Sequence, residues 1–286
     1  MPRNASRTAQ LAALARAALH REKHPPRCED HLAEAFLTPP LRVMLRLGFL
    51  YKPLFRSRMP GTYEFLLARS LFFDACTRDE LDSGVEQVVI LGAGLDTRAY
   101  RFPRATFFEV DAPATSSLKQ ERVRALYREP PAHVRYVQVD FTRDDLRASL
   151  LKAGFRRVRT LFLWEGVTFY IPWNAIRDVL TMVREESAPG SAIVFDHLWE
   201  DVVSGPTRRY GAQKGREFVA KQGEPFMFGF RQGEVAPALS ALGFTLERLL
   251  EPADQQDLIR RPDGSVMGRI SEMYGMVLAR VAAPPA

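Results

Sequence analysis

The apolar positions of the N-terminal part of the chain recur at helical spacing and are interrupted by prolines and glycines. Leu11, Leu14 and Leu19 lie on one face of a predicted helix, and Pro25 lies beyond its end. Similar stretches, ended by further prolines or opened by Gly61, predict three more helices. The expected helices cover residues 8–20, 30–37, 41–55 and 63–77.

After Gly84 the pattern changes to short apolar runs that alternate with helical stretches. The runs at 87–91, 106–110, 135–139, 160–164 and 191–195 predict strands, and the helical stretches are 115–127, 143–153 and 172–187. This alternation is typical of a parallel sheet with helices on both faces. Two last runs, 245–250 and 272–281, are joined by a polar loop and predict an antiparallel pair. We therefore expect an α/β fold with a mixed sheet.

Composition and charge narrow the class of protein. Of 286 residues, 46% are hydrophobic, which excludes a disordered chain. With only two cysteines the chain cannot form a disulfide framework, and this number fits a reducing cytosol. Neither a signal peptide nor an apolar run of ~20 residues, the length of a membrane-spanning helix, is visible. We expect a cytoplasmic protein with no membrane partner. Residues 1–60 hold eleven Lys/Arg against four Asp/Glu, whereas the remainder holds 29 against 30. That basic segment fits a nucleic-acid reader, a lid over an anionic substrate, or a solvated face.

The first predicted strand runs into a glycine loop. Gly92, Ala93 and Gly94 allow a ligand to approach the backbone closely. The pattern is GxGxxT, so it lacks the third glycine of a dinucleotide fingerprint. This difference disfavours NAD or FAD as the ligand.

Acidic residues end the other strands of the predicted parallel sheet. Because ligands bind at the carboxyl ends of such strands, we expect these acids to surround one site. An acid after the second strand accepts from ribose hydroxyls, one after the third accepts from an adenine amine, and one after the fourth faces a ligand ammonium. The corresponding residues are Glu109 with Val110 beside it, Asp140 with Phe141 to cover the base, Glu165, and Asp196 after the fifth strand.

An adenosine ligand that carries an ammonium and a sulfonium, but no phosphates, suits such a site. S-adenosylmethionine has this composition, and a pyrophosphate would be repelled by Glu165 and Asp196. Arg69 interrupts an apolar helix before the sheet, and its guanidinium suits a two-pronged contact with the methionine carboxylate.

Other candidate residues concern the acceptor and metals. The aromatic run around Phe226 and Phe228 suits a pocket wall for a flat, apolar acceptor. His197 is the candidate general base for an acceptor that needs one. The histidines at 20, 24 and 31 do not share one helical face, so we predict no metal site.

The chain resembles the leucine carboxyl methyltransferase family, specifically its bacterial small-molecule branch. The matching motifs are Ala68-Arg69-Ser70, the run QVVILGAGLDTRAYRF, Phe108-Glu109-Val110-Asp111-x-Pro113 and Trp164-Glu165-Gly166-x-x-x-Tyr170. The resemblance implies a class I, Rossmann-like methyltransferase fold with a seven-stranded sheet whose last strand is antiparallel. It implies that Arg69, Gly92, Glu109, Asp140 and Glu165 bind S-adenosylmethionine, and that Tyr170 contacts the acceptor.

The resemblance also implies an organisation and a reaction. We expect an N-terminal helical lid (1–62) and a methyltransferase domain (63–286) with a substrate-cap insertion at about 199–235. Members methylate carboxylates, or hydroxyls of natural products such as aromatic polyketides. The sequence thus predicts an O-methyltransferase for a small acceptor with an acidic oxygen. A protein C-terminal carboxylate as acceptor, an NAD(P)-dependent oxidoreductase and a nucleic-acid-binding module are the alternatives.

Overall fold

The computed structural model describes residues 7–140, 143–221, 223 and 225–283. Its strands are β1 (Gln87–Leu91), β2 (Thr106–Asp111), β3 (Val134–Gln138), β4 (Thr160–Trp164), β5 (Ala192–Leu198), β6 (Phe244–Leu250) and β7 (Tyr274–Val281). They form one seven-stranded sheet in the order β3-β2-β1-β4-β5-β7-β6. β1 to β5 are parallel, and β7 is antiparallel to both β5 and β6. The predicted mixed sheet is therefore confirmed.

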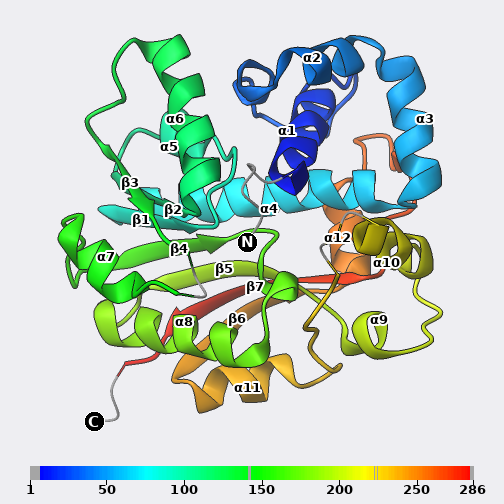
Figure 1. Cartoon of the computed structure of the whole chain (residues 1–286). Coiled ribbons are helices and arrows are strands. Elements are labelled where there is room, and N and C mark those ends of the chain that lie inside the picture. Colours follow the sequence, from blue (N-terminus) through cyan, green and yellow to red (C-terminus); the bar gives the residue numbers. More distant parts are fainter. Residues whose placement is uncertain (1–6, 141–142, 222, 224, 284–286) are drawn as a thin grey trace.

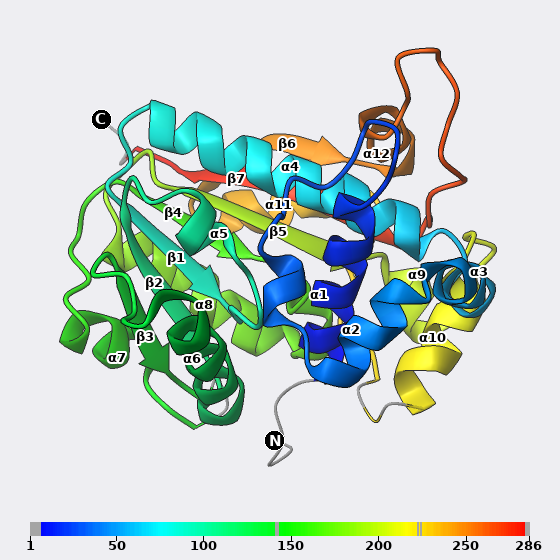
Figure 2. The same ribbon diagram turned by 90° about the horizontal axis from the view of Figure 1, so that it is seen from above.

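Helices cover both faces of the sheet. They are α1 (Arg7–His20), η1 (Ala33–Phe36), α2 (Pro39–Arg46), α3 (Gly48–Arg58), α4 (Thr62–Asp82), α5 (Arg98–Arg101), α6 (Pro113–Tyr127), α7 (Leu146–Lys152), η2 (Thr168–Tyr170), α8 (Trp173–Glu186), α9 (Glu200–Ser204), α10 (Ala212–Lys221), α11 (Val235–Ala241) and α12 (Pro252–Leu258). Figure 1 shows α4, α5 and α6 on one face, and α7, α8 and α11 on the other. α1 and α2 lie beyond α4, and α9 and α10 lie at the end where β5 finishes (Figures 1 and 2).

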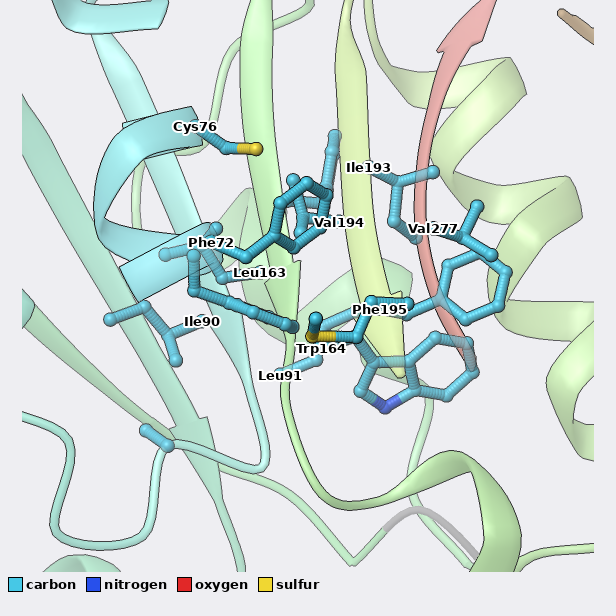
Figure 3. Packing of buried hydrophobic residues seen from close by; sticks show 14 of the residues in the cluster. Phe72, Cys76, Ile90, Leu91, Leu163, Trp164, Ile193, Val194, Phe195 and Val277 are labelled. Carbon is cyan, nitrogen blue, oxygen red and sulfur yellow. The ribbon is translucent and has the colours of Figure 1, made fainter. Parts of the chain in front are cut away.

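Burial of the central strands on both faces explains why their sequences are unbroken apolar runs. Every residue of β1, β4 and β5 is buried, because these central strands have helices on both sides. Phe72 and Cys76 of α4 belong to the same buried cluster as Ile90, Leu163 and Val194 (Figure 3). The strand order reverses between β1 and β4, and a crevice for a ligand is expected at such a point.

Three expected elements differ from those observed. The single helix expected at 41–55 is two helices, α2 and α3, which break beside Gly48, a poor helix former. The helix expected at 30–37 is only the short 3-10 turn η1, because the Asp30 side chain binds Arg16 and Thr97 instead of capping a longer helix. The loop expected between the last two strands contains α12, which begins with Pro252 and a capping box.

The N-terminal helices share the core of the sheet domain. Residues 13–15 and 17–19 of α1 are buried, and most of them belong to the same apolar cluster as the strands. The boundary between 1–62 and 63–286 therefore remains a prediction. Within the described residues, no helix is both long enough and apolar enough to cross a membrane.

Candidate functional site

A cavity of about 490 Å³ opens at the carboxyl ends of the parallel strands. Its wall is built from α1, α3, α4, the loop after β1, the ends of β2 and β4, and the segment around residues 218–227. One part of the wall is charged and the other is apolar and aromatic. Segments far apart in the sequence therefore meet at the point where the strand order reverses.

The glycine loop approaches this cavity as expected. Gly92, Ala93 and Gly94 all line it. Gly92 has φ = +69°, and a Cβ atom there would lie 2.5 Å from Cγ2 of Val167. The Ala93 N–H donates to the carbonyl of Val110 at 2.9 Å, which ties the loop to β2. The glycines thus satisfy both a left-handed backbone and a close contact.

The acid of β2 that lines the cavity is Asp111, and not Glu109 as we expected. Glu109 is buried, pairs with Lys119 Nζ at 2.8 Å and does not line the cavity. Val110 does not line the cavity either, and its backbone carbonyl accepts the hydrogen bond from Ala93 of the glycine loop. Residues 109 and 111 point to the same face of β2, but only Asp111 lies at the carboxyl end of the strand.

Backbone amides hold Asp111 in place. Its carboxylate accepts from the N–H of Gly94 at 2.5 Å and from the N–H of Ala112 at 2.6 Å. Burial raises the pKa of Asp111, and these two amide donors oppose that effect. Burial also raises the pKa of Glu109, against the opposing charge of Lys119.

Glu165 and Arg69 both line the cavity, and they pair with each other. Arg69 Nε lies 3.1 Å from Glu165 Oε1, and Arg69 NH1 donates to Asp196 Oδ2 at 2.8 Å. The second oxygen of Glu165 accepts from Arg98 at 2.6 Å. Burial acts to raise the pKa of Glu165, but Arg98 and Arg69 more than offset it and hold that pKa below its usual value. Glu165 is therefore ionised at neutral pH.

Asp196 differs in position from its prediction. It lies inside β5, not after its end, since that strand continues to Leu198. Besides Arg69, it accepts from the Gly166 N–H at 2.6 Å. Burial raises the pKa of Asp196, although Arg69 lowers it. Asp196 thus supports Arg69 from behind the cavity wall, as it is fully buried and not a lining residue.

A wider buried ionic network surrounds these residues, and the sequence reasoning missed it. Arg98 binds Asp74 of α4 at 2.7 Å and also pairs with Asp96, two residues after the glycine loop. Arg16 of α1 binds Asp30 at 2.8 Å and donates to the carbonyl of Leu95 at 2.6 Å. Charged residues within otherwise apolar segments, such as Asp74 in FFDAC, were the available signal.

The residues expected to surround the adenine are only partly placed. Val139 lines the cavity, whereas Asp140, the next residue in the chain, is not a lining residue. The Asp140 N–H donates to Asp144 at 2.8 Å. Phe141 lies outside the described residues.

The aromatic run around Phe226 and Phe228 lies beside the cavity, but neither of these two rings lines it. Tyr170 lines it as expected. Phe226 instead packs on Phe169, with 5.6 Å between ring centroids, and Phe228 stacks on Trp173 at 5.3 Å. The lining residues of this segment alternate with them, namely Pro225 and Met227.

His197 does not line the cavity, so the structure gives no support to its prediction as a general base. Adjacent residues of a strand face opposite sides, and Asp196 occupies the side that faces Arg69. The His197 ring is fully buried against Trp199 and Phe230, with ring centroids 4.8 and 5.1 Å away. Burial lowers its pKa to about 4.

Tyr274, at the start of β7, was not identified from the sequence. It lines the cavity and stacks on Phe65, with 3.9 Å between ring centroids. Burial raises the pKa of Tyr274, so its hydroxyl remains protonated at neutral pH. Within the described residues, no group of three or more His, Cys, Asp or Glu side chains has the arrangement of a metal site.

Known proteins with similar sequences carry the name of one class of enzyme. YktD of Bacillus subtilis (strain 168), provisionally named as an S-adenosyl-L-methionine-dependent methyltransferase, is 32% identical over 196 residues, which cover 67% of this chain and 64% of the relative. A protein of Mycolicibacterium gilvum (strain PYR-GCK) with the same provisional name is 38% identical over 167 residues, 54% of each chain. The chain thus spans less than two thirds of either relative.

A crystal structure and a family model complete the comparison. The structure of a provisionally named methyltransferase from Thermobifida fusca YX superposes with a TM-score of 0.59, covers 96% of this chain and 95% of its own, and is 16% identical. It supports the predicted class I methyltransferase fold. The model of the leucine carboxyl methyltransferase family matches residues 9–184. Because that match runs from α1 to α8 and includes the glycine loop, Asp111 and Glu165, the chain belongs to the leucine carboxyl methyltransferase family.

Proposed function

We propose that this protein is an S-adenosylmethionine-dependent O-methyltransferase, and that its acceptor is a small, largely apolar molecule with a carboxylate. One observation carries the proposal: the glycine loop, Asp111, Glu165 and Arg69 line the same cavity as an apolar, aromatic wall. Such a cavity can hold a polar cofactor and an apolar acceptor side by side.

The charged part of the cavity fits the proposed cofactor. Asp111 is placed to accept from ribose hydroxyls, since its backbone donors fix both carboxylate oxygens. Glu165, ionised by its arginine neighbours, suits the ammonium, and Arg69 suits the methionine carboxylate. A pyrophosphate would meet the charges of Asp96, Asp111 and Glu165. The adenine is assigned to the side near Val139 and Asp140.

The cofactor supplies a methyl group that is already electrophilic because it is bonded to a positively charged sulfur. The protein's task is then to orient the acceptor and to exclude water. Phe55 and Met59 of α3, Leu66 of α4 and Met227 provide apolar surface for this purpose. We assign α1, which contributes Leu11 to the wall, to the predicted lid.

The chemistry of the wall favours a carboxylate over a phenol. A carboxylate is ionised at neutral pH and needs no general base, whereas a phenol with a pKa near ~10 does. Among the described lining residues there is no histidine, and His197 faces away. The Tyr274 hydroxyl remains a donor and can orient the acceptor oxygen.

Two measurements test the proposal. Isothermal titration should detect S-adenosylmethionine binding and no binding of NADPH, which serves as the control for a dinucleotide enzyme. Methyl transfer from radiolabelled cofactor should then be compared for an aromatic carboxylic acid and the matching phenol. A methyl ester releases methanol in base, whereas a methyl ether does not. A base-stable product from the phenol, with no ester from the acid, would contradict the assignment.

A further inference from the structure

The outer face of α2 and α3 exposes an unusual concentration of apolar side chains. Eleven large apolar side chains are exposed among the described residues, and five of them lie in this short stretch. Phe49 is the most exposed of all, at 73%. We define the α2–α3 face by Val43, Met44, Leu47, Phe49 and Leu54. Scattered exposed apolar residues need no explanation, but such a concentration within two adjoining helices indicates an interaction surface.

The segment that forms this face carries charges of one sign. Residues 38–60 contain five Lys/Arg and no Asp or Glu. Two of the five are used inside the protein, since Lys52 pairs with Glu22 and Arg56 pairs with Glu64. The other three, Arg42, Arg46 and Arg58, are exposed and form no ion pair with any described residue.

We propose that the α2–α3 face binds the surface of a bilayer that contains anionic lipid. Exposed apolar side chains beside arginines match the chemistry of the interface, where headgroup phosphates lie over acyl chains. A symmetric contact between two copies would instead oppose three unpaired arginines to three others, with no acid in residues 38–60 to compensate. The binding is peripheral, and it replaces the expectation that the protein has no membrane partner.

The position of the face relative to the cavity gives this contact a role. α3 carries Leu54 on the exposed surface and Phe55 and Met59 on the cavity wall. Figure 2 shows α3 beside α10, and α10 contributes Phe218 and Val219 to the cavity wall. We assign this part of the molecule as the route by which a lipophilic acid passes from the bilayer into the cavity. This last step rests on the proposed function, whereas membrane binding does not.

Vesicle sedimentation tests the contact on the full chain. The protein should sediment with vesicles of phosphatidylcholine and phosphatidylglycerol, and much less with phosphatidylcholine alone. Phe49→Asp should weaken partitioning by roughly 10–100-fold, the effect of one lost buried aromatic side chain. Arg42→Glu with Arg46→Glu should weaken it by at least roughly thirtyfold, and added salt should act in the same direction.

Matched controls separate this surface from general charge and hydrophobicity. Leu151→Asp removes an exposed leucine from α7, and Arg177→Glu with Arg184→Glu reverses two exposed charges on α8, across the sheet from α2 (Figure 1). Both controls should sediment like the wild type. Equal losses in the controls, or no preference for anionic vesicles, would overturn the proposal.

Two further readouts keep the outcomes distinct. Sedimentation velocity should find the same oligomeric state for the wild type and Phe49→Asp. Self-association that Phe49→Asp abolishes, without vesicle binding, would reassign the face to a second copy of the chain. S-adenosylmethionine affinity should be unchanged in all variants, so a failed cofactor titration would refute the proposed function and leave the membrane result to stand on its own.

Discussion

Replacing Asp111 by Asn tests which acid of β2 binds the ribose. Asp111 accepts from the amides of Gly94 and Ala112 at 2.5 and 2.6 Å, and both bonds depend on its charge. In Asp111→Asn one of these donors faces an NH₂ group, and the site loses its charged acceptor. A lost charge-assisted hydrogen bond is worth about 1.5–3 kcal/mol, so S-adenosylmethionine should bind roughly 10–100-fold more weakly.

Glu109→Gln is the matched control, since it neutralises an acid of the same strand, on the same face. It breaks the buried contact with Lys119, so the loss should appear mainly as a lower free energy of unfolding, by about 3–5 kcal/mol. Isothermal titration measures affinity, and thermal unfolding measures stability. The reasoning is refuted if Glu109→Gln loses cofactor affinity while folded, or if Asp111→Asn keeps it.

The remaining predictions concern the cofactor, the acceptor and pH. Arg69→Lys should weaken S-adenosylmethionine binding by about tenfold or more in a titration, because an ammonium cannot contact Glu165 and also make a two-pronged contact with the ligand carboxylate. An unchanged affinity would show that Arg69 does not bind that carboxylate. Tyr274→Phe should lower kcat/KM for the acceptor by about 2–10-fold at unchanged cofactor affinity, and a loss of cofactor binding would contradict this role. Met227→Glu should raise KM for an apolar acid by about tenfold or more in steady-state assays, and an unchanged KM would place the acceptor elsewhere. Burial lowers the pKa of His197 to about 4 in the folded protein. As the pH falls below ~6.5, this histidine therefore becomes protonated in the unfolded chain before it does so in the folded one. The free energy of unfolding should consequently be lower by about 2 kcal/mol at pH 5 than at pH 7. His197→Asn should remove that dependence and leave the pH profile of turnover unchanged; a changed turnover profile would restore His197 as a base.

The arrangement of the strands was predictable because it depends on short-range patterns. Central strands such as β1 and β4 are buried on both faces, so their apolar runs are unambiguous in the sequence. The glycine loop and Glu165 were found for the same reason, since each directly follows such a run. Which side chains of β2 and β5 reach the cavity depends on where these two strands end. A strand that ends one residue later brings Asp111 to the cavity, and a strand that continues past Asp196 turns His197 away.

The residues that were missed depend on contacts between distant segments. Tyr274 reaches the cavity only because β7 pairs with β5 antiparallel, with Tyr274 opposite Leu198. Met227 and not Phe226 faces the cavity because the segment is oriented by contacts with Phe169. No local spacing reports these contacts, so the aromatic run indicated a wall without indicating which side chains form its surface.

The two bonds of Arg16 have a consequence for the binding of ligands. One guanidinium joins α1 to Asp30 and to the carbonyl of Leu95, which immediately follows the glycine loop. Any excursion of α1 away from the cavity must therefore strain or break a bond to the loop that is placed to hold the cofactor. We therefore expect the position of α1 and the occupancy of the glycine loop to be coupled, so that a bound cofactor slows amide hydrogen exchange in α1.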